Sequence, residues 1–445
     1  MGELLNLIDE KKYFEARRQI QEMKSADIAE FIEEIRDDPR LVVVFRLLPK
    51  DIGAEVFSYL SRDLQRAVVE VINDSELARI IDDLFLDDTV DFLEEMPASI
   101  VKRVIKTASS ETRKYINQLL MYPEDSAGSL MTIELQELDG DWTVGRSIDE
   151  IRRHCADKES ISTLFVTDGK RRLEGVISLR DVLGGRDDQL VSELMERNVI
   201  SVNTHDDQAV AAMLFKKYDF ESLPVVDMEN RLVGIITIDD IVDVIEEEAS
   251  EDIYKMAAMQ PIEASYVQSG VIMLARKRIV WLVVLMLSAT LTGLIIEKYQ
   301  SALAVNVMLA SFIPMLMGTG GNAGSQASVS VIRSLTLGEV GFKDILWIMW
   351  KELRISLMVG IMIAAVNYAR IIFMYQDSQM ALIVSLTLVC VVVVSKLVGC
   401  TLPLLATKLR LDPALMASPL ITTIVDALSL TIFFNIASFL LNISY

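Results

Sequence analysis

The chain has 445 residues, of which 51% are hydrophobic, and a formal net charge of −21. The charge is unevenly distributed, since residues 1–275 hold 57 acidic and 31 basic side chains and residues 276–445 hold 7 acidic and 12 basic ones. This split predicts an acidic soluble part followed by a membrane part, and such acidity argues against a nucleic-acid partner and favours cations. The three cysteines, Cys155, Cys390 and Cys400, lack the spacing of a disulfide framework or a metal site.

The first domain, residues 1–121, is expected to be all-α, because leucine, isoleucine and valine recur at helical spacing and glycines are few. Similar segments begin at Ala26, Lys50, Asp74 and Ala98, at intervals of 24 residues. This period predicts helical hairpins stacked into a short superhelix. The start of the chain has no apolar signal sequence, so we expect this domain in the cytoplasm.

Residues 122–187 and 188–249 form an internal duplication of short β runs alternating with helices. Residues 173–182 are matched by residues 232–241, an offset of 59, and each copy follows another β run. Upstream, the Ser-Leu-Met sequence ending at Met131 is matched by Glu-Leu-Met ending at Met195. This order resembles a tandem pair of CBS domains, which are small α/β modules.

In CBS domains, a Ser/Thr-x-x-Asp sequence after the second β run often contacts the ribose of an adenine nucleotide. The matching positions here are Ser178 with Asp181 and Thr237 with Asp240. The resemblance makes ATP a candidate regulator. Without the resemblance to CBS domains, each of these positions is interpreted simply as a helix N-cap.

The connecting helix, residues 250–277, follows an acidic run. Residues 239–252 contain eight carboxylates and no lysine or arginine. Like charges at i, i+4 weaken a helix, so bound divalent cations would relieve the repulsion.

The membrane domain, residues 278–445, contains five apolar stretches. They cover residues 279–296, 302–332, 355–373, 380–406 and 414–443. In a five-pass arrangement most of the flanking basic residues fall on one side, which the positive-inside rule places in the cytoplasm. We therefore expect a multi-pass protein of the plasma (inner) membrane, with cytoplasmic N-terminal domains and Tyr445 outside.

The second apolar stretch holds residues that are unusual in a span, among them Pro314, Gly318, Asn322 and Gln326. Backbone freed by proline and glycine is tolerated in a membrane only where it is buried in protein or lines water. Pore lining is the favoured interpretation. Close helix packing is the alternative, and it explains the glycines but not the two amides.

The last apolar stretch carries a single ionisable residue, Asp426. A mid-membrane aspartate costs about 2.5–3.5 kcal/mol on insertion scales, so it should face protein, water or an ion. Thr422 and Thr423 lie one helical turn away, which indicates a cation path. An ion pair with Arg370 or Lys396 is the alternative.

The chain resembles the MgtE family of magnesium channels along its whole length, most specifically at four segments. These are residues 122–131, 314–326, 412–414 and 419–426. The resemblance implies an all-α superhelical domain, a CBS pair, a connecting helix and a five-helix transmembrane domain. It also implies a homodimer with a pore lined by the second and fifth spans.

By similarity, Asp426 of both subunits would hold a hydrated Mg²⁺, with Thr422, Thr423 and Asn322 as further hydrogen-bond partners. This suits Mg²⁺, which gives up water reluctantly and binds through one or two carboxylates. No energy-coupling motif is needed for uptake, because a dication gains about 4.6 kcal/mol per 100 mV of inside-negative potential.

We expect cytosolic Mg²⁺ to close the channel by drawing acidic groups of the soluble part together. Solvated helix faces are often acidic, so an ordinary surface is the alternative for any one residue. The candidate regulatory ligands are Asp87, Asp88, Asp91, Asp219, Asp240, Asp243, Glu251, Asp252 and Asp412.

Three other functions remain open at this point. A broader divalent channel or exchanger for Mn²⁺, Co²⁺ or Ni²⁺ is the first, since carboxylate and water ligands do not exclude Mn²⁺. A membrane-tethered nucleotide or Mg²⁺ sensor is the second. An enzyme is the least favoured, because neither a nucleophile–base pair nor a catalytic motif such as HExxH is recognisable.

Overall fold

The computed structural model describes residues 2–49, 52–94, 96–262, 266, 269–416 and 418–442. It divides into two compact units, Met1–Glu246 and Glu247–Tyr445. The expectations for Lys50 and Tyr445 concern residues outside this description.

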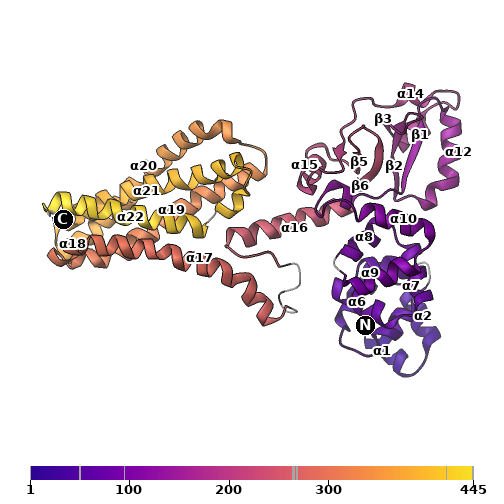
Figure 1. Cartoon of the computed structure of the whole chain (residues 1–445), viewed down its shortest axis with the longest axis horizontal. Coiled ribbons are helices and arrows are strands. Elements are labelled where there is room, and N and C mark those ends of the chain that lie inside the picture. The colour runs from indigo at the N-terminus through magenta and orange to yellow at the C-terminus, as the bar shows by residue number, and fades with distance from the viewer. Residues whose placement is uncertain are drawn as a thin grey trace. The chain divides into compact units, whose positions relative to one another are not determined.

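The N-terminal part of the first unit is helical, as predicted. Alternate helices pack together, α3 on α5, α5 on α7 and α7 on α9, and their apolar faces form one core in which the rings of Phe57 and Phe92 meet edge to face at 5.3 Å. The helix starts follow local chemistry: Asn73 accepts hydrogen bonds from two backbone amides at the start of α7, in a capping box with Glu76. The helices are α1 (Gly2–Asp9), α2 (Tyr13–Gln21), α3 (Ser25–Glu34), α4 (Leu41–Leu47), α5 (Gly53–Ser58), α6 (Arg62–Val71), α7 (Asp74–Asp83), α8 (Leu86–Glu94), α9 (Ala98–Thr107) and α10 (Ser110–Leu119) (Figure 1).

The rest of the first unit contains two small three-stranded sheets, which confirms the duplicated α/β module. In each sheet the middle strand is parallel to the first strand and antiparallel to the third. The strands are β1 (Leu135–Asp139), β2 (Ser160–Thr167), β3 (Leu173–Ser178), β4 (Val202–Asn203), β5 (Ser222–Val226) and β6 (Leu232–Thr237). The helices are α11 (Ala127–Leu130), α12 (Val144–His154), a 3-10 turn Cys155–Asp157, α13 (Leu179–Gly184), α14 (Val191–Leu194) and α15 (Gln208–Tyr218).

The two sheets exchange the segments that precede them in sequence. Thr132 pairs with Ile235 of the second sheet. Correspondingly, Glu196 pairs with Val176 of the first sheet. Each exchanged methionine faces a glycine of the other repeat: a Cβ on Gly234 would lie 2.7 Å from Sδ of Met131, and one on Gly175 would lie 2.6 Å from Sδ of Met195. The glycines therefore permit this close packing.

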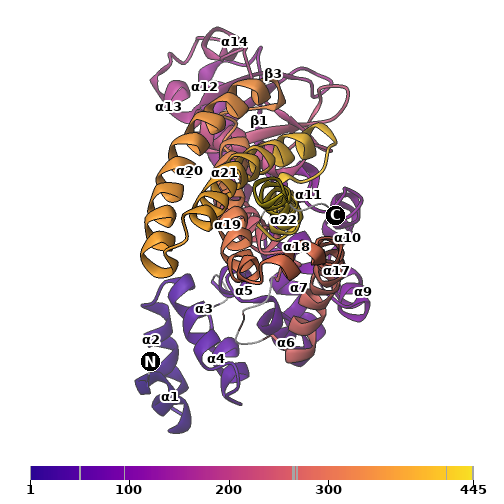
Figure 2. The same ribbon diagram turned by 90° about the vertical axis from the view of Figure 1, so that its left-hand side faces the viewer.

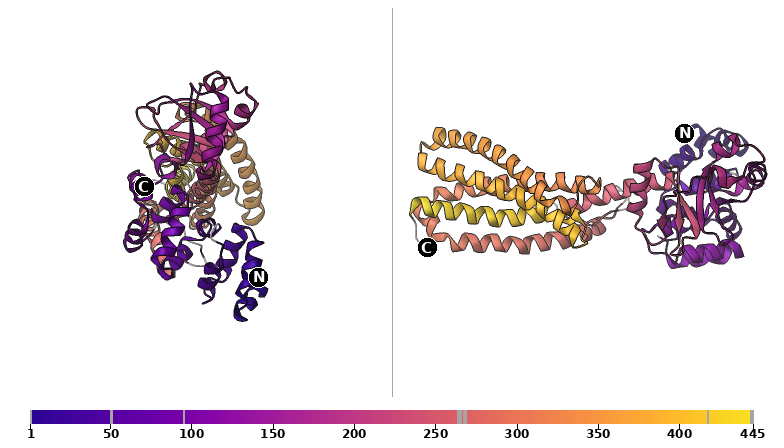
Figure 3. Two further views of the ribbon diagram at one scale, coloured as in Figure 1. Left: turned by 90° about the vertical axis from the view of Figure 1, so that its right-hand side faces the viewer. Right: turned by 90° about the horizontal axis from the view of Figure 1, so that it is seen from above.

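Helix α16 (Ile238–Met256) contains the boundary between the two units, at Glu246 and Glu247. The second unit is a helical bundle, seen from further sides in Figures 2 and 3. The remaining helices are α17 (Val271–Lys298), α18 (Gln300–Val305), α19 (Met308–Thr336), the 3-10 turn Phe342–Asp344, α20 (Ile345–Tyr375), α21 (Ser378–Lys408), the 3-10 helix Pro413–Met416 and α22 (Ser418–Leu441). Among the described residues, four segments are long and apolar enough to cross a membrane: Val271–Lys298, Phe342–Tyr375, Ser378–Lys408 and Pro413–Leu441. Helix α19 is equally long at 29 residues, but its glycines, serines and amides make it less apolar.

Helix α19 packs against both α21 and α22, and its glycines allow the contact. A Cβ on Gly320 would lie 2.8 Å from Cγ1 of Val425, and one on Gly324 would lie 2.8 Å from Cγ2 of Ile421. Helix α19 continues through Pro314 as one helix, so the proline and glycines do not interrupt this span. These glycines serve close packing.

Candidate metal centre and pore

Three carboxylates of the first unit come together where the helical domain meets the first sheet. Oxygen atoms of Asp87, Glu134 and Glu159 all lie within 4.8 Å of one another. Asp87 belongs to the first turn of α8, while Glu134 and Glu159 immediately precede β1 and β2. Carboxylate oxygens at this separation are the donor set that Mg²⁺ and Ca²⁺ take in proteins.

Backbone contacts explain why these residues meet. The amide of Glu159 donates to the carbonyl of Glu134 at 2.9 Å, because β1 and β2 are paired from Leu135 and Ser160 onward. Oε2 of Glu134 in turn accepts the amide of Leu86 at 3.0 Å. That bond places a carboxylate at the N-terminus of α8, where the helix dipole favours negative charge.

Without a cation, the ionised carboxylates of this cluster repel one another. Asp87 is 9% exposed, and burial together with the charges of Asp240, Glu159 and Asp88 raises the pKa of its carboxyl group well above the ordinary value. Burial and the neighbouring aspartates raise the pKa of Glu159 to about 8. Oε2 of Glu159 is buried and accepts no hydrogen bond in the described part of the chain.

Two further aspartates named from the sequence surround this triad. Burial raises the pKa of Asp88 to about 6, with Asp91 and Asp239 adding to the effect, and burial raises that of Asp240 to about 7. Asp91 is different, because it forms an ion pair with Arg62. Arg62 compensates the charge of Asp91, whereas a divalent ion would offset the repulsion among the other carboxylates of the cluster.

The sequence did not lead us to Glu134 and Glu159. The available signal was their position directly before two β runs that pair in parallel, which makes them neighbours on adjacent strands. Recognising this signal requires knowing that the two β runs pair with each other, and the order of residues along the chain does not show that pairing.

Other regulatory candidates lie apart from the triad. Asp219 is not a member of it and caps α15 in a left-handed conformation with φ of 54°. Asp243 is exposed, and partial desolvation and the charges of Glu246 and Asp91 raise its pKa. The remaining candidates, Glu251, Asp252 and Asp412, belong to the second unit.

The predicted nucleotide positions form equivalent pairs in the two repeats. The hydroxyl of Ser178 donates to Oδ2 of Asp181, and the hydroxyl of Thr237 donates to Oδ2 of Asp240, both at 2.6 Å. Asp181 is exposed, whereas Asp240 lies beside the acidic cluster. The same sequence pattern therefore occupies two different electrostatic environments.

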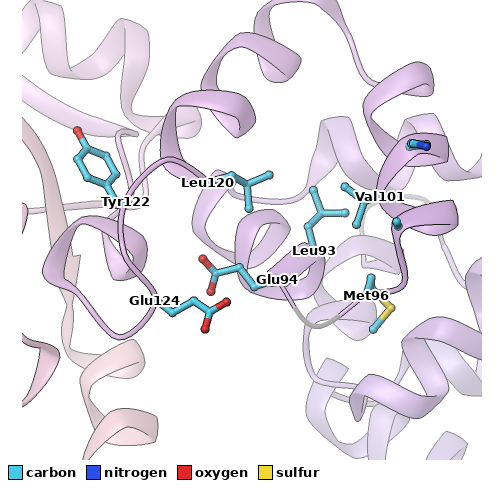
Figure 4. A pocket seen from close by; sticks show the side chains of 9 residues that line it. Leu93, Glu94, Met96, Val101, Leu120, Tyr122 and Glu124 are labelled. Atoms are coloured by element: carbon cyan, nitrogen blue, oxygen red, sulfur yellow. The ribbon is translucent and has the colours of Figure 1, made fainter.

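An open cavity of about 630 Å³ lies in the same unit (Figure 4). Its apolar wall includes Leu93, Met96 and Leu120, and Glu94 and Glu124 point into it. Burial and the charges of Asp91 and Glu124 raise the pKa of Glu94 to about 7. The acidic character of this unit thus extends beyond the triad.

In the second unit, Thr422, Thr423 and Asp426 share helix α22. The two threonine hydroxyls donate to the carbonyl of Pro419 at 2.9 and 3.1 Å, so their oxygen lone pairs remain available as acceptors. A Cβ on Gly321 would lie 2.9 Å from Cγ2 of Thr422, which places α19 directly against this helix. Asn322, the residue after Gly321, is exposed in the single chain, and Asp426 is partly exposed.

Asp426 forms no ion pair within the described part of the chain. The two bases that could have paired with it have other partners. Lys396 lies beside Glu352, and Arg370 donates to Oδ1 of Asn367 at 2.8 Å. An uncompensated carboxylate on a membrane helix is a candidate for ion binding.

Comparison with known proteins identifies the relatives of this chain. Three family models match: "MgtE intracellular N domain" at residues 23–125, "CBS domain" at 127–186 and 191–247, and MgtE, "Divalent cation transporter", at 313–436. The magnesium transporter MgtE of Thermus thermophilus is 36% identical, covering 96% of this chain and 95% of the relative. That of Bacillus subtilis is 31% identical, covering 98% and 96%.

Solved structures agree with this relationship. A crystal structure of the cytosolic domain of the Mg²⁺ channel MgtE in complex with ATP covers 54% of this chain and 98% of its own, with 37% identity and a TM-score of 0.52. The soluble part of a magnesium transporter covers 56% and 97%, with 29% identity and a TM-score of 0.52. The matching family is one of transporters and not of enzymes. Because the relatives align over nearly the whole length of both chains, this protein belongs to the MgtE family.

Proposed function

We propose that this protein is a Mg²⁺-selective channel for magnesium uptake, which works passively and closes when cytosolic Mg²⁺ binds its acidic domains. The observation that carries the pore proposal is Asp426, which has no basic partner in the described part of the chain and lies one turn from two threonines. Similarity to the relatives named magnesium transporter supports Mg²⁺ as the cargo.

The pore chemistry follows from charge and hydration. In a homodimer, two Asp426 carboxylates would face each other across the symmetry axis and bind the ion through its water shell. Thr422, Thr423 and Asn322 would hydrogen-bond the same water. The basic residues at one side of the spans support cytoplasmic soluble domains and an outward C-terminus in the plasma membrane.

The regulatory part of the proposal rests on the acidic triad and its neighbours. Asp87 and Asp88 lie on α8, and Asp240 lies in the first turn of α16, so a shared cation would tie the helical domain to the start of α16. A ligand shifts a conformational equilibrium only through preferential binding to one state. In the folded unit, oxygen atoms of Asp87, Glu134 and Glu159 lie within 4.8 Å of one another, so an ion bound there would favour the compact state.

The decisive experiment is Mg²⁺ uptake into a cell that lacks its own Mg²⁺ transport. Asp426→Ala should abolish Mg²⁺ uptake into these cells when it is present in the membrane at the same level as the unaltered protein. The matched control is Glu339→Gln, because Glu339 is an exposed residue whose carboxylate accepts a hydrogen bond from Ser334 at 3.0 Å. Unchanged uptake and ion preference in Asp426→Ala would disprove the permeation route.

The alternative cargo, Mn²⁺, Co²⁺ or Ni²⁺, can be tested in the same cells. Carboxylate and water ligands admit Mn²⁺, while the two histidines, His154 and His205, both belong to the soluble unit. We therefore expect Mg²⁺ uptake to persist in the presence of equimolar Ni²⁺ and Co²⁺. Stronger flux of either metal than of Mg²⁺ would favour the broader channel.

ATP is proposed as a regulator through the CBS pair, because a relative's cytosolic domain was crystallised with ATP. Titration calorimetry with ATP on the intact chain should give binding that Asp181→Ala or Asp240→Ala weakens. Absence of heat with the unaltered protein would end this part of the proposal.

A further inference from the structure

One lysine joins two segments of the second unit that are far apart in sequence. Nζ of Lys255, near the end of α16, lies 2.6 Å from Oδ2 of Asp412. It also lies 2.8 Å from Oε1 of Glu251, one helical turn earlier. Asp412 belongs to the turn between α21 and α22.

The contact is better shielded than an ordinary surface ion pair. The side chain of Lys255 is 22% exposed and that of Asp412 is 29% exposed. The other oxygen of Asp412, Oδ1, accepts the amide of Ala414 at 2.8 Å, so the carboxylate is held by its own turn. Charge-assisted hydrogen bonds between partly desolvated groups are stronger than those in open solvent.

Asp252 brings a third carboxylate to this place. Burial and the charge of Asp412 raise the pKa of Asp252. Glu251, Asp252, Asp412 and Lys255 together carry a net charge of −2, which one divalent cation would neutralise. Without the lysine, the same three carboxylates would carry −3.

We propose that Lys255 is a built-in counter-ion that holds the end of α16 against Asp412 when divalent metal is absent. An ammonium group suits this role because it is a compact charge on a flexible stem and can turn between neighbouring carboxylates. A Mg²⁺ ion arriving here shares the carboxylates with Lys255 or displaces it. The consequence for flux rests on the proposed function, whereas the contact itself does not.

The consequence is a residual closed population at low Mg²⁺. With Lys255 present, the end of α16 stays docked in part of the molecules even in chelator. Removing the charge should release the helix end in chelator and leave closure wholly dependent on metal. Lys255 is thus a positioning residue. It raises the fraction of closed molecules at low Mg²⁺ without contacting the permeating ion.

The experiment is hydrogen exchange of residues 249–256 in the full-length protein in lipid nanodiscs, with EDTA or with millimolar Mg²⁺. In EDTA, Lys255→Gln should exchange about tenfold faster than the unaltered chain. Lys255→Arg, which keeps the charge, should restore slow exchange. In Mg²⁺ all three proteins should be protected.

Asp412→Asn separates the cross-segment contact from simple helix stabilisation. It leaves Lys255 and Glu251 in place, so a helix effect alone would keep exchange slow in EDTA. We expect fast exchange in EDTA, and also in Mg²⁺ because a metal ligand is lost. Equal exchange of Lys255→Gln and the unaltered chain in EDTA, or slow exchange of Asp412→Asn there, would overturn the inference.

Flux through proteoliposomes distinguishes failure of this inference from failure of the proposed function. With EDTA on the side of the soluble domains, Lys255→Gln should pass Mg²⁺ faster than Lys255→Arg. A chain that carries no Mg²⁺ flux in any form would disprove the channel and leave the exchange result to decide the contact. Equal flux of the two variants, in a chain that does conduct, would disprove the role of Lys255 in closure.

Discussion

Nζ of Lys396 on α21 lies 3.6 Å from Oε2 of Glu352 on α20, and the two side chains are 8% and 13% exposed. This pair resolves an alternative that the sequence leaves open, since Lys396 was a possible partner of Asp426. Because the base already has a carboxylate beside it, Asp426 is left for another cation. The pair also joins α20 to α21, and α21 in turn packs against α19.

Lys396→Met should destabilise the bundle. Removing one member of a buried pair leaves the other charge uncompensated, which costs about 3–5 kcal/mol, whereas an apolar replacement of both is often neutral. The double variant with Glu352→Met should therefore melt closer to the unaltered protein than Lys396→Met does. Thermal unfolding in detergent measures this.

The control for that comparison is Lys298→Met, because Lys298 is an exposed residue of α17. It should leave the melting temperature nearly unchanged. If Lys396→Met melts like Lys298→Met, the pair contributes nothing and Lys396 is again available to other carboxylates.

Gly399→Ala should disrupt the contact between α21 and α19. A Cβ on Gly399 would collide with the carbonyl oxygen of Gly324, and backbone cannot move aside as a flexible side chain can. Overpacking of this kind costs about 1–3 kcal/mol. Gly318→Ala is the matched control, since a Cβ there meets nothing within 4 Å.

Thermal stability and Mg²⁺ uptake should both fall in Gly399→Ala and be retained in Gly318→Ala. If the two variants behave alike, the close approach of these helices is not needed for folding or transport.

The local patterns of the sequence were sufficient for the architecture. Repeated apolar spacing indicated the helices, and the offset of 59 residues identified two copies of one α/β module. These features depend on neighbours in the chain. The exchange of Met131 and Met195 between the repeats could not be predicted, because it depends on which surface each segment meets after folding.

The same limit applies to the candidate sites. Asp87, Asp88 and Asp240 were named from the sequence and do lie near one another, but the two carboxylates that share a possible ion site with Asp87, namely Glu134 and Glu159, stand just before β1 and β2. In α19, proline and glycines suggested freed backbone, whereas the helix is continuous and its glycines let Val425 and Ile421 approach closely. Composition shows that a segment is unusual, and only the packing shows why.

Glu159→Gln should weaken the response of the soluble unit to Mg²⁺. The variant removes a charge whose Oε2 is buried and accepts no hydrogen bond among the described residues, so a bound ion loses one ligand. We expect the Mg²⁺ concentration that protects this unit from protease to rise at least about tenfold. Glu196→Gln, at an exposed position, is the control and should not shift it.

If Glu159→Gln and the unaltered chain need the same Mg²⁺ concentration for protection, the triad is not the regulatory site. Protection that is independent of Mg²⁺ in both proteins would reject metal-dependent compaction altogether.

The stability of the first unit should fall as pH rises from about 5 to about 8 in the absence of divalent metal. The folded unit holds protons on Asp88, Asp240 and Glu159, whose pKa values are raised to about 6, 7 and 8, while an unfolded chain releases them near pH 4. Because the folded state binds more protons throughout this interval, its free energy of unfolding decreases with pH. Asp38, whose pKa is lowered to about 2 by its hydrogen bonds with Arg40, contributes only below this interval.

Hydrogen exchange of β2 in the full-length protein, at pH 5.5 and pH 8 in EDTA, measures this dependence. Exchange corrected for its intrinsic pH dependence should be faster at pH 8, and millimolar Mg²⁺ should reverse the loss there, because a cation replaces the protons. Glu159→Gln should flatten the profile, since one of the titrating groups is gone. A corrected stability that rises between pH 5.5 and pH 8 would contradict the proposed repulsion, because it would mean that these carboxylates are already compensated within the folded chain.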